Sequence, residues 1–220
     1  TATLLGDGRV LVVGGLIASP CEIDDEPRPC MASTDSVEIW DPKTGKFAAG
    51  PALGEGNGRA AHTATLLHDG RVLIAGGAPH VYSTPDDPAV KDFVFDPRTS
   101  TWKPTNDAAF RAYHTATVLA DGSVLAIGGT HDGCGCCARL PGAGPFESSI
   151  KRFDPVTDTW SLAGVSRVPR DRHGAALLSD GSVLVVGGES QEWGHKDRPF
   201  GSCERWIDRP GASSDSTTKH

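Results

Sequence analysis

The sequence predicts an all-β protein built from a tandem repeat, and three observations lead to this prediction. A nine-residue segment recurs four times with little change, at Asp7–Gly15, Asp69–Gly77, Asp121–Gly129 and Asp180–Gly188. Each copy holds a short aliphatic run of strand length between residues that favour turns. No window places apolar residues at helical spacing beside helix-capping residues. The copies start 62, 52 and 59 residues apart, so we expect small units that pack on their neighbours.

Each repeat holds four expected strands. The first, such as His62–Leu67, ends at Asp-Gly, a strong signal for a two-residue hairpin turn. The second, such as Val72–Ala75, is a continuous aliphatic run, typical of a strand that is buried on both faces. It stops at a glycine pair. The third ends at an Asp-Pro turn, and the fourth carries one aromatic ring, which is Phe47, Trp102 or Trp160.

Four antiparallel strands in roughly 50 residues are typical of one blade of a β-propeller. The order Arg-x-x-His, Asp-Gly, Gly-Gly, aromatic-Asp-Pro and Trp resembles the kelch motif. Two copies carry this order in full, Arg59/His62/Gly76/Gly77/Phe95/Trp102 and Arg111/His114/Gly128/Gly129/Phe153/Trp160. A third copy begins with Arg170/His173/Gly187/Gly188/Trp206. The first copy lacks its start and continues with Gly14/Gly15/Trp40/Phe47. The usual third-strand Tyr is Trp or Phe in every copy.

The resemblance implies kelch propeller repeats over residues 1–211, divided as 1–50, 51–104, 105–164 and 165–211. The last repeat lacks a fourth strand, and the polar tail 212–220 is expected to be disordered. Comparable kelch propellers close with more than four blades, and an arc of four would leave two broad apolar faces exposed. We therefore expect part of a larger ring, completed by further sequence or a second chain. A closed four-bladed ring is the second alternative, and pairing of two chains is the third.

The charge balance excludes two classes of partner. The chain has 21 basic and 28 acidic side chains, a net charge of −7, which is the wrong sign for binding nucleic acid or an anionic membrane. No stretch approaches the ~18 consecutive apolar residues of a membrane span.

The glycine pairs predict close packing rather than ligand binding. No pair opens a helix, so they do not form a phosphate-binding loop. We expect them to allow tight packing around the propeller axis. They are Gly14, Gly15, Gly76, Gly77, Gly128, Gly129, Gly187 and Gly188.

Three arginines precede the histidines, and the sequence leaves two roles open for them. Arg59, Arg111 and Arg170 either satisfy backbone carbonyls and turn carboxylates, or ring the mouth of the channel and accept an acidic partner. Tyr113 and Arg172 occupy one repeat position, directly before a motif histidine, and Ala61 holds the matching place in the second repeat. The kelch resemblance nominates Tyr113 and Arg172 for binding, because mouth arginines hold peptides in some kelch propellers. The long loops after the glycine pairs are expected to complete the binding face.

All six cysteines lie outside the repeat core. A disulfide between Cys21 and Cys30 would close a ten-residue loop and stabilise the fold by roughly 2–3 kcal/mol. A bridge from Cys134, Cys136 or Cys137 to Cys203 is open as well. The even cysteine count favours an extracellular or cell-envelope location, and we expect a secreted bacterial protein. We expect no cofactor and no metal, and the alternative is copper or another soft metal at loop residues such as His80, His131, Cys134 and His195.

The resemblance also implies one enzymatic alternative, a fragment of a galactose oxidase-type copper-radical oxidase. Arg111–Gly129 resembles the blade that supplies the radical tyrosine, which would be Tyr113. That chemistry needs a cysteine on the first strand of the preceding blade, and Arg59–Leu67 contains none. No catalytic set is otherwise visible, because the repeated aspartates occupy turns. We therefore expect a non-catalytic kelch scaffold that binds a protein or glycan through its loops.

Overall fold

The computed structural model describes residues 1–23, 26–79, 90–109, 111–130, 147–190, 198–199 and 202–207, with the backbone alone for residues 20–30 and 198–199. Within these ranges every regular element is a β-strand, as the sequence predicts. The polar tail 212–220, expected to be disordered, lies outside the described residues.

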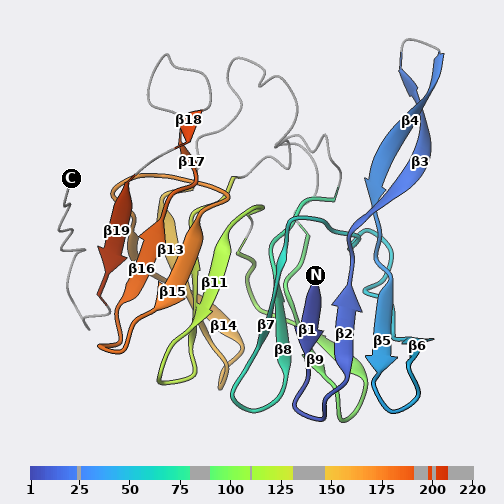
Figure 1. Ribbon diagram of the computed structural model, residues 1–220, viewed down its shortest axis with the longest axis horizontal. Coiled ribbons are helices and arrows are strands. Elements are labelled where there is room, and N and C mark those ends of the chain that lie inside the picture. Colours follow the sequence, from blue (N-terminus) through green and yellow to red (C-terminus); the bar gives the residue numbers. More distant parts are fainter. Residues whose placement is uncertain are drawn as a thin grey trace.

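The strands form successive antiparallel sheets, which we call the first to the fourth blade (Figure 1). The first blade contains β1 (Ala2–Leu4), β2 (Val10–Val13), β5 (Val37–Asp41) and β6 (Lys46–Ala49). The second contains β7 (Thr63–Leu66), β8 (Val72–Ala75), β9 (Phe93–Asp96) and β10 (Thr101–Pro104). The third contains β11 (Thr115–Val118), β12 (Val124–Ile127), β13 (Ser149–Asp154) and β14 (Thr159–Val165). The fourth contains, among the described residues, β15 (Gly174–Leu177), β16 (Val183–Val186) and β19 (Cys203–Trp206).

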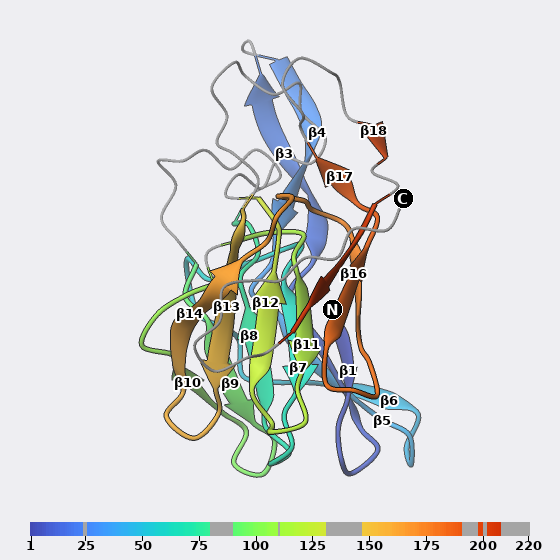
Figure 2. The same cartoon turned by 90° about the vertical axis from the view of Figure 1, so that its left-hand side faces the viewer.

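The first strands of the blades lie side by side at the inner edge of the arrangement. β1 contacts β7, β7 contacts β11, and β11 contacts β15. Figure 2 shows the stacked sheets from the side. This radial arrangement of four-stranded blades is a β-propeller architecture.

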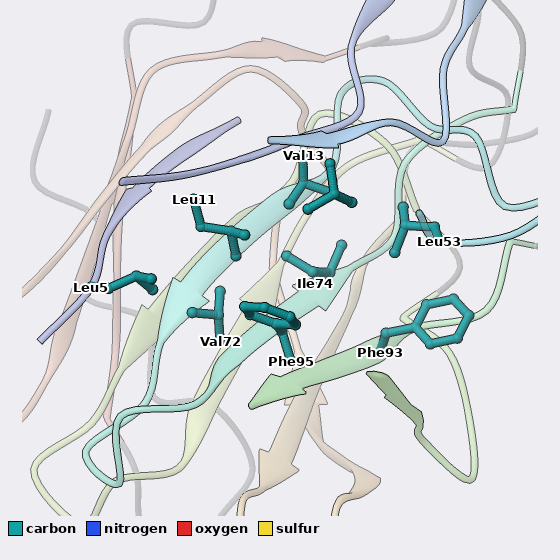
Figure 3. Close-up of a cluster of buried hydrophobic side chains, with 9 residues drawn as sticks. Leu5, Leu11, Val13, Leu53, Val72, Ile74, Phe93 and Phe95 are labelled. Carbon is teal, nitrogen blue, oxygen red and sulfur yellow. The ribbon is translucent and has the colours of Figure 1, made fainter. Parts of the chain in front are cut away.

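Buried apolar clusters join each blade to the next. Figure 3 shows the first cluster, in which Leu11 and Val13 of β2 pack with Val72, Ile74 and Phe95 of the second blade. All four residues of β8 and of β12 are buried. These two strands have a blade on each side, which explains why their sequences are aliphatic without alternation.

The two end blades do not cover one another. β2 alternates between half-buried and buried residues, and β16 ends in the exposed Val186. Leu4 of β1 is 64% exposed and Phe47 of β6 is 61% exposed. The four blades form an open arc, so the alternative of a closed four-bladed ring is wrong for this chain (Figure 1).

The two ends of the blades differ. The loop end is the edge where the second strands stop at their glycine pairs, and the turn end is the opposite edge, which carries the Asp-Gly hairpins. Two ribbons extend from the loop end, β3 (Leu16–Ile23) with β4 (Glu26–Ser33), and β17 (Glu189–Ser190) with β18 (Arg198–Pro199) (Figure 1).

The pairing of β3 with β4 does not support the predicted Cys21–Cys30 disulfide. Cys21 lies opposite Arg28, and Cys30 lies opposite Ser19. The two cysteines are therefore not cross-strand partners, and diagonal positions in a ribbon are about 7–8 Å apart, whereas the Cβ atoms of a disulfide are about 4 Å apart.

Candidate functional site

The three motif arginines are buried between the strands of their own blades. Each guanidinium donates to the carbonyl of the first glycine of a pair and to a carbonyl just before or at the start of the third strand. Arg59 donates to Gly76 at 3.1 Å and to Lys91 at 2.6 Å. Arg111 donates to Gly128 at 3.2 Å and to Ser149 at 2.7 Å, and Arg170 donates to Gly187 at 3.0 Å and to Ser202 at 3.1 Å.

This geometry supports the structural role that the sequence left open for these arginines. Burial lowers the pKa of Arg59 to about 10, and the nearby Asp92 carboxylate opposes the shift. The side chain stays cationic at neutral pH and its donors hold the blade together. A role of Arg59, Arg111 and Arg170 in binding a partner stays a prediction.

The three motif histidines join each blade to the preceding one. The Nε2 atoms of His62, His114 and His173 lie 2.9, 3.0 and 2.9 Å from the hydroxyls of Thr1, Thr63 and Thr115. Burial lowers the pKa of His114 to about 3 and that of His173 to about 4. These imidazoles are neutral at pH 7, so they act as hydrogen-bonding groups rather than charges.

The first glycine of a pair lies where the next blade approaches most closely, and the second glycine of the later pairs packs against its own blade. A Cβ atom on Gly14 would lie 2.5 Å from the carbonyl oxygen of Arg59, and one on Gly77 would lie 2.9 Å from that of Ala60. All eight glycines of the pairs have positive φ. The geometry agrees with the expected packing role and gives these residues no ligand-binding task.

The residue just before each motif histidine adopts an unusual backbone conformation. Ala61, Tyr113 and Arg172 have φ of 56°, 59° and 50°, in the left-handed region that non-glycine residues rarely occupy. Hydrogen bonds fix this backbone, because Tyr113 N–H donates to the Ala61 carbonyl at 2.9 Å and Arg172 N–H donates to the Tyr113 carbonyl at 3.0 Å. Such strain persists only where the surroundings enforce it, and it often marks functional positions.

Tyr113 and Arg172 meet at the loop end. The Arg172 guanidinium carbon lies 4.2 Å from the centre of the Tyr113 ring, a cation–π contact. Its Nη1 atom lies 3.2 Å from a carboxylate oxygen of Glu189 and 3.7 Å from one of Asp171. Burial opposes protonation of Arg172, but the two carboxylates and Tyr113 outweigh it, and its pKa is raised. The side chain is 29% exposed, so this ordered group still reaches solvent.

The sequence identified Tyr113 and Arg172 as residues at the same repeat position, and the structure brings them together. It did not identify Asp171 and Glu189 as partners of Arg172. A signal was present for Asp171, because the matching residues in the preceding repeats are the uncharged Ala60 and Ala112. Glu189 follows a glycine pair, where no repeat pattern constrains the residue.

A cleft of about 470 Å³ opens beside the base of the β3–β4 ribbon. Its walls combine carboxylates with small and apolar residues. They are Ile17, Ser33, Thr34, Asp35, Glu55, Gly56, Gly58 and Pro79. The cleft gives the loop end a concave feature in addition to the Tyr113–Arg172 pair.

The metal and oxidase alternatives have no support among the described residues. Within them, no three His, Cys, Asp or Glu side chains are grouped to hold a metal ion. His80, His131, Cys134, Cys136, Cys137 and His195 lie outside the described residues, and Cys203 is an exposed thiol on β19. The oxidase alternative needs a cysteine on the first strand of the blade that precedes Tyr113, and that strand, β7, contains none. The Tyr113 ring contacts Arg172. We also find no helix in the described part of the chain with the length and apolar character of a membrane span.

Comparisons with known proteins agree with the propeller architecture. No family model matches the chain. The chain is 26% identical over 141 residues to β-scruin of Limulus polyphemus, a kelch-repeat protein, covering 63% of this chain and only 14% of β-scruin. It also superposes on the structure of YjhT with a TM-score of 0.70 and 16% identity, covering 95% of this chain and 68% of that one. The blades and these likenesses together show a β-propeller fold and support a relationship to the kelch proteins.

Proposed function

We propose that the chain is a non-catalytic kelch-type scaffold that binds a protein partner at its loop end, with Tyr113 and Arg172 at the centre of the contact. One observation carries the proposal. The frame repeats almost unchanged from blade to blade, yet the strained position before each histidine carries Ala61, Tyr113 and Arg172 in turn. A fixed backbone that presents different side chains is how rigid scaffolds acquire binding specificity.

The chemistry of the pair suits protein recognition. Tyr and Arg are enriched among residues that dominate binding energy at protein interfaces. The ring stack and the two carboxylates hold the Arg172 guanidinium in place, so little side-chain entropy is lost on binding. Polar groups of a partner can then meet both the Arg172 cation and the carboxylate of Glu189, whose side chain is 36% exposed, whereas the buried Asp171 only holds Arg172 in place.

In the first step, peptides that bind the immobilised chain are selected from a random library displayed on phage. Selected peptides are measured against the parent chain, Tyr113→Ala and Arg172→Ala by calorimetry. We expect each variant to weaken binding about 10-fold or more, the size of effect found at interface hot spots. Arg98→Ala is the matched control, because this exposed arginine lies at the turn end and pairs with Asp96.

Equal affinity of all selected peptides for the parent chain and both loop-end variants would reject the proposed site. Loss of binding with Arg98→Ala alone would place the contact at the turn end. A parallel glycan array tests the other ligand class, and saturable glycan binding without selection of any peptide would replace the protein partner by a glycan. A location outside the cytoplasm stays a prediction.

A further inference from the structure

Three interfaces within the chain show how neighbouring blades meet. Second-strand residues alternate between the two faces of a blade, and one set packs against the next blade. Leu11 and Val13 share a buried cluster with Val72 and Ile74. The same relation recurs for the next two interfaces, Leu73 and Ala75 with Val124 and Ala126, and Leu125 and Ile127 with Val183 and Val185.

The fourth blade leaves its forward face uncovered. We use this name for Leu178, Leu184 and Val186, which occupy the positions that face the next blade in the other repeats. Val186 is 48% exposed, whereas Val13, Ala75 and Ile127 at the same repeat position are all 0% exposed. Leu178 and Leu184 are half-buried. Apolar residues occupy this face although the described structure shows no blade packed against them.

The first blade leaves the complementary rear face uncovered. Its members are Leu4, Val10, Val12, Trp40 and Phe47, at positions that face the preceding blade in other repeats. Phe47 is 61% exposed, whereas Trp160 at the same repeat position is 8% exposed and packs in the second interface. Val10, Val12 and Trp40 are half-buried, so the rear face is a continuous apolar sheet surface with one aromatic side chain on β5 and one on β6.

We propose that the forward face of the fourth blade docks on the rear face of the first blade in a second copy of this chain, head to tail. The occupant follows from continuity with the three interfaces inside the chain. In each of them aliphatic residues of a forward face meet valine and aromatic residues of a rear face. A second copy offers this same pair of surfaces in the same orientation.

The new junction is weaker than the internal ones. Gly174 stands where the other blades carry Thr1, Thr63 and Thr115, so this side of the junction offers no hydroxyl to a motif histidine. The fourth blade offers three described strands, each four residues long. At about 4.8 Å between strands and about 3.3 Å per residue, this face is also small for an interface that normally buries about 800 Å² per partner. We therefore expect dissociation constants from about 1 μM to about 1 mM.

Sedimentation equilibrium of the chain across that concentration range tests the proposal. A reductant in the buffer prevents disulfide bridging through the exposed Cys203. The mean mass should rise with concentration for the parent chain and stay at the monomer value for Leu4→Lys and for Val186→Lys. Both residues are largely exposed, so a lysine is tolerated in the monomer.

A mixture of the two variants is the decisive sample. Leu4→Lys keeps an intact forward face and Val186→Lys keeps an intact rear face, so the mixture should form a dimer and nothing larger. Val156→Lys is the matched control, because Val156 is 90% exposed in the turn after β13, away from both faces. It should associate like the parent chain.

Several outcomes would overturn the proposal. A parent chain that stays monomeric across the range shows that a second copy is not the occupant, which leaves these faces to other blades or another protein. Association that survives both lysine substitutions places the contact elsewhere. If either single variant still associates alone, or if the mixture stays monomeric, the contact is not head to tail.

Discussion

The carbonyl oxygen of Arg59 in the second blade accepts the N–H of Gly15 in the first blade at 2.9 Å. The same oxygen would lie 2.5 Å from a Cβ atom on Gly14. The backbones of neighbouring blades therefore meet with no room for a side chain. This contact explains why a glycine directly follows the second strand in each of the first three blades, where Gly14, Gly76 and Gly128 all meet a carbonyl of the next blade.

Replacement of Gly14 by Ala should destabilise the fold by roughly 3–5 kcal/mol, because it combines left-handed backbone strain with a clash against fixed backbone. Gly70→Ala is the control. Gly70 also has positive φ, but a Cβ atom added to it would meet nothing within 4 Å, so only the conformational cost of about 1–2 kcal/mol remains. Urea unfolding measures both values, and equal losses would show that the interblade clash is absent.

Replacement of Thr63 by Val should cost about 1–3 kcal/mol, because the buried imidazole of His114 loses its hydroxyl partner while the side-chain shape is kept. Thr99→Val removes a hydroxyl that pairs with Thr101 at an exposed turn and should change the free energy of unfolding by less than about 0.5 kcal/mol. Equal stability of the two variants would mean that the Thr–His contacts do not hold the blades together.

The repeat pattern was sufficient to predict the strands of the blades and their antiparallel order, but not the β3–β4 ribbon, which lies in a segment expected to be a loop. Asp-Gly, Asp-Pro and Gly-Gly are local signals that act within a few residues, and they recur in register. The sequence also placed Tyr113 and Arg172 at one repeat position. It did not predict their ring contact, because residues 59 apart meet only through the rotation between blades.

The sequence was less informative about the role of the three motif arginines and about whether the four blades close into a ring. Arg59, Arg111 and Arg170 were open to a binding role because a charged side chain in a crossing segment is normally exposed. Their burial follows from the carbonyls that converge on each guanidinium. The closed four-bladed alternative failed because the angle between blades is set by side-chain packing, which a strand pattern does not encode.

The free energy of unfolding should fall as the pH is lowered below about 6.5, because the buried histidines stay neutral in the folded chain. Unfolded histidines take up protons near that pH, whereas the folded chain holds His173 neutral to about pH 4 and His114 to about pH 3. Each can reduce the free energy of unfolding by up to about 1.4 kcal/mol per pH unit in this window. His114→Gln should therefore flatten the pH dependence measured by urea unfolding, while Thr99→Val, which removes no titratable group, should leave it unchanged. An unaltered slope in His114→Gln would contradict the assignment.

Asp92 should act in the opposite direction. Burial raises its pKa to about 6, although its carboxylate accepts N–H groups of Gly76 at 2.8 Å and Ala109 at 2.6 Å. The folded chain therefore binds a proton more readily than the unfolded chain. The resulting stabilisation is complete below about pH 3.8 and is lost as the pH rises through about 6. The side-chain carboxyl carbon signal in NMR should titrate near pH 6, and a midpoint below 4 would show that the hydrogen bonds outweigh burial.

If a rigid frame presents Tyr113 and Arg172 as a fixed pair for binding at the loop end, NMR titration of the labelled chain with a selected peptide will locate the contact there. The largest shift changes are expected at Tyr113, Arg172 and their neighbours at the loop end, with the turn-end amides of Gly70 and Gly122 unchanged. Changes confined to those turn-end amides, with Tyr113 and Arg172 unmoved by saturating peptide, would show that the loop-end pair is not the binding site.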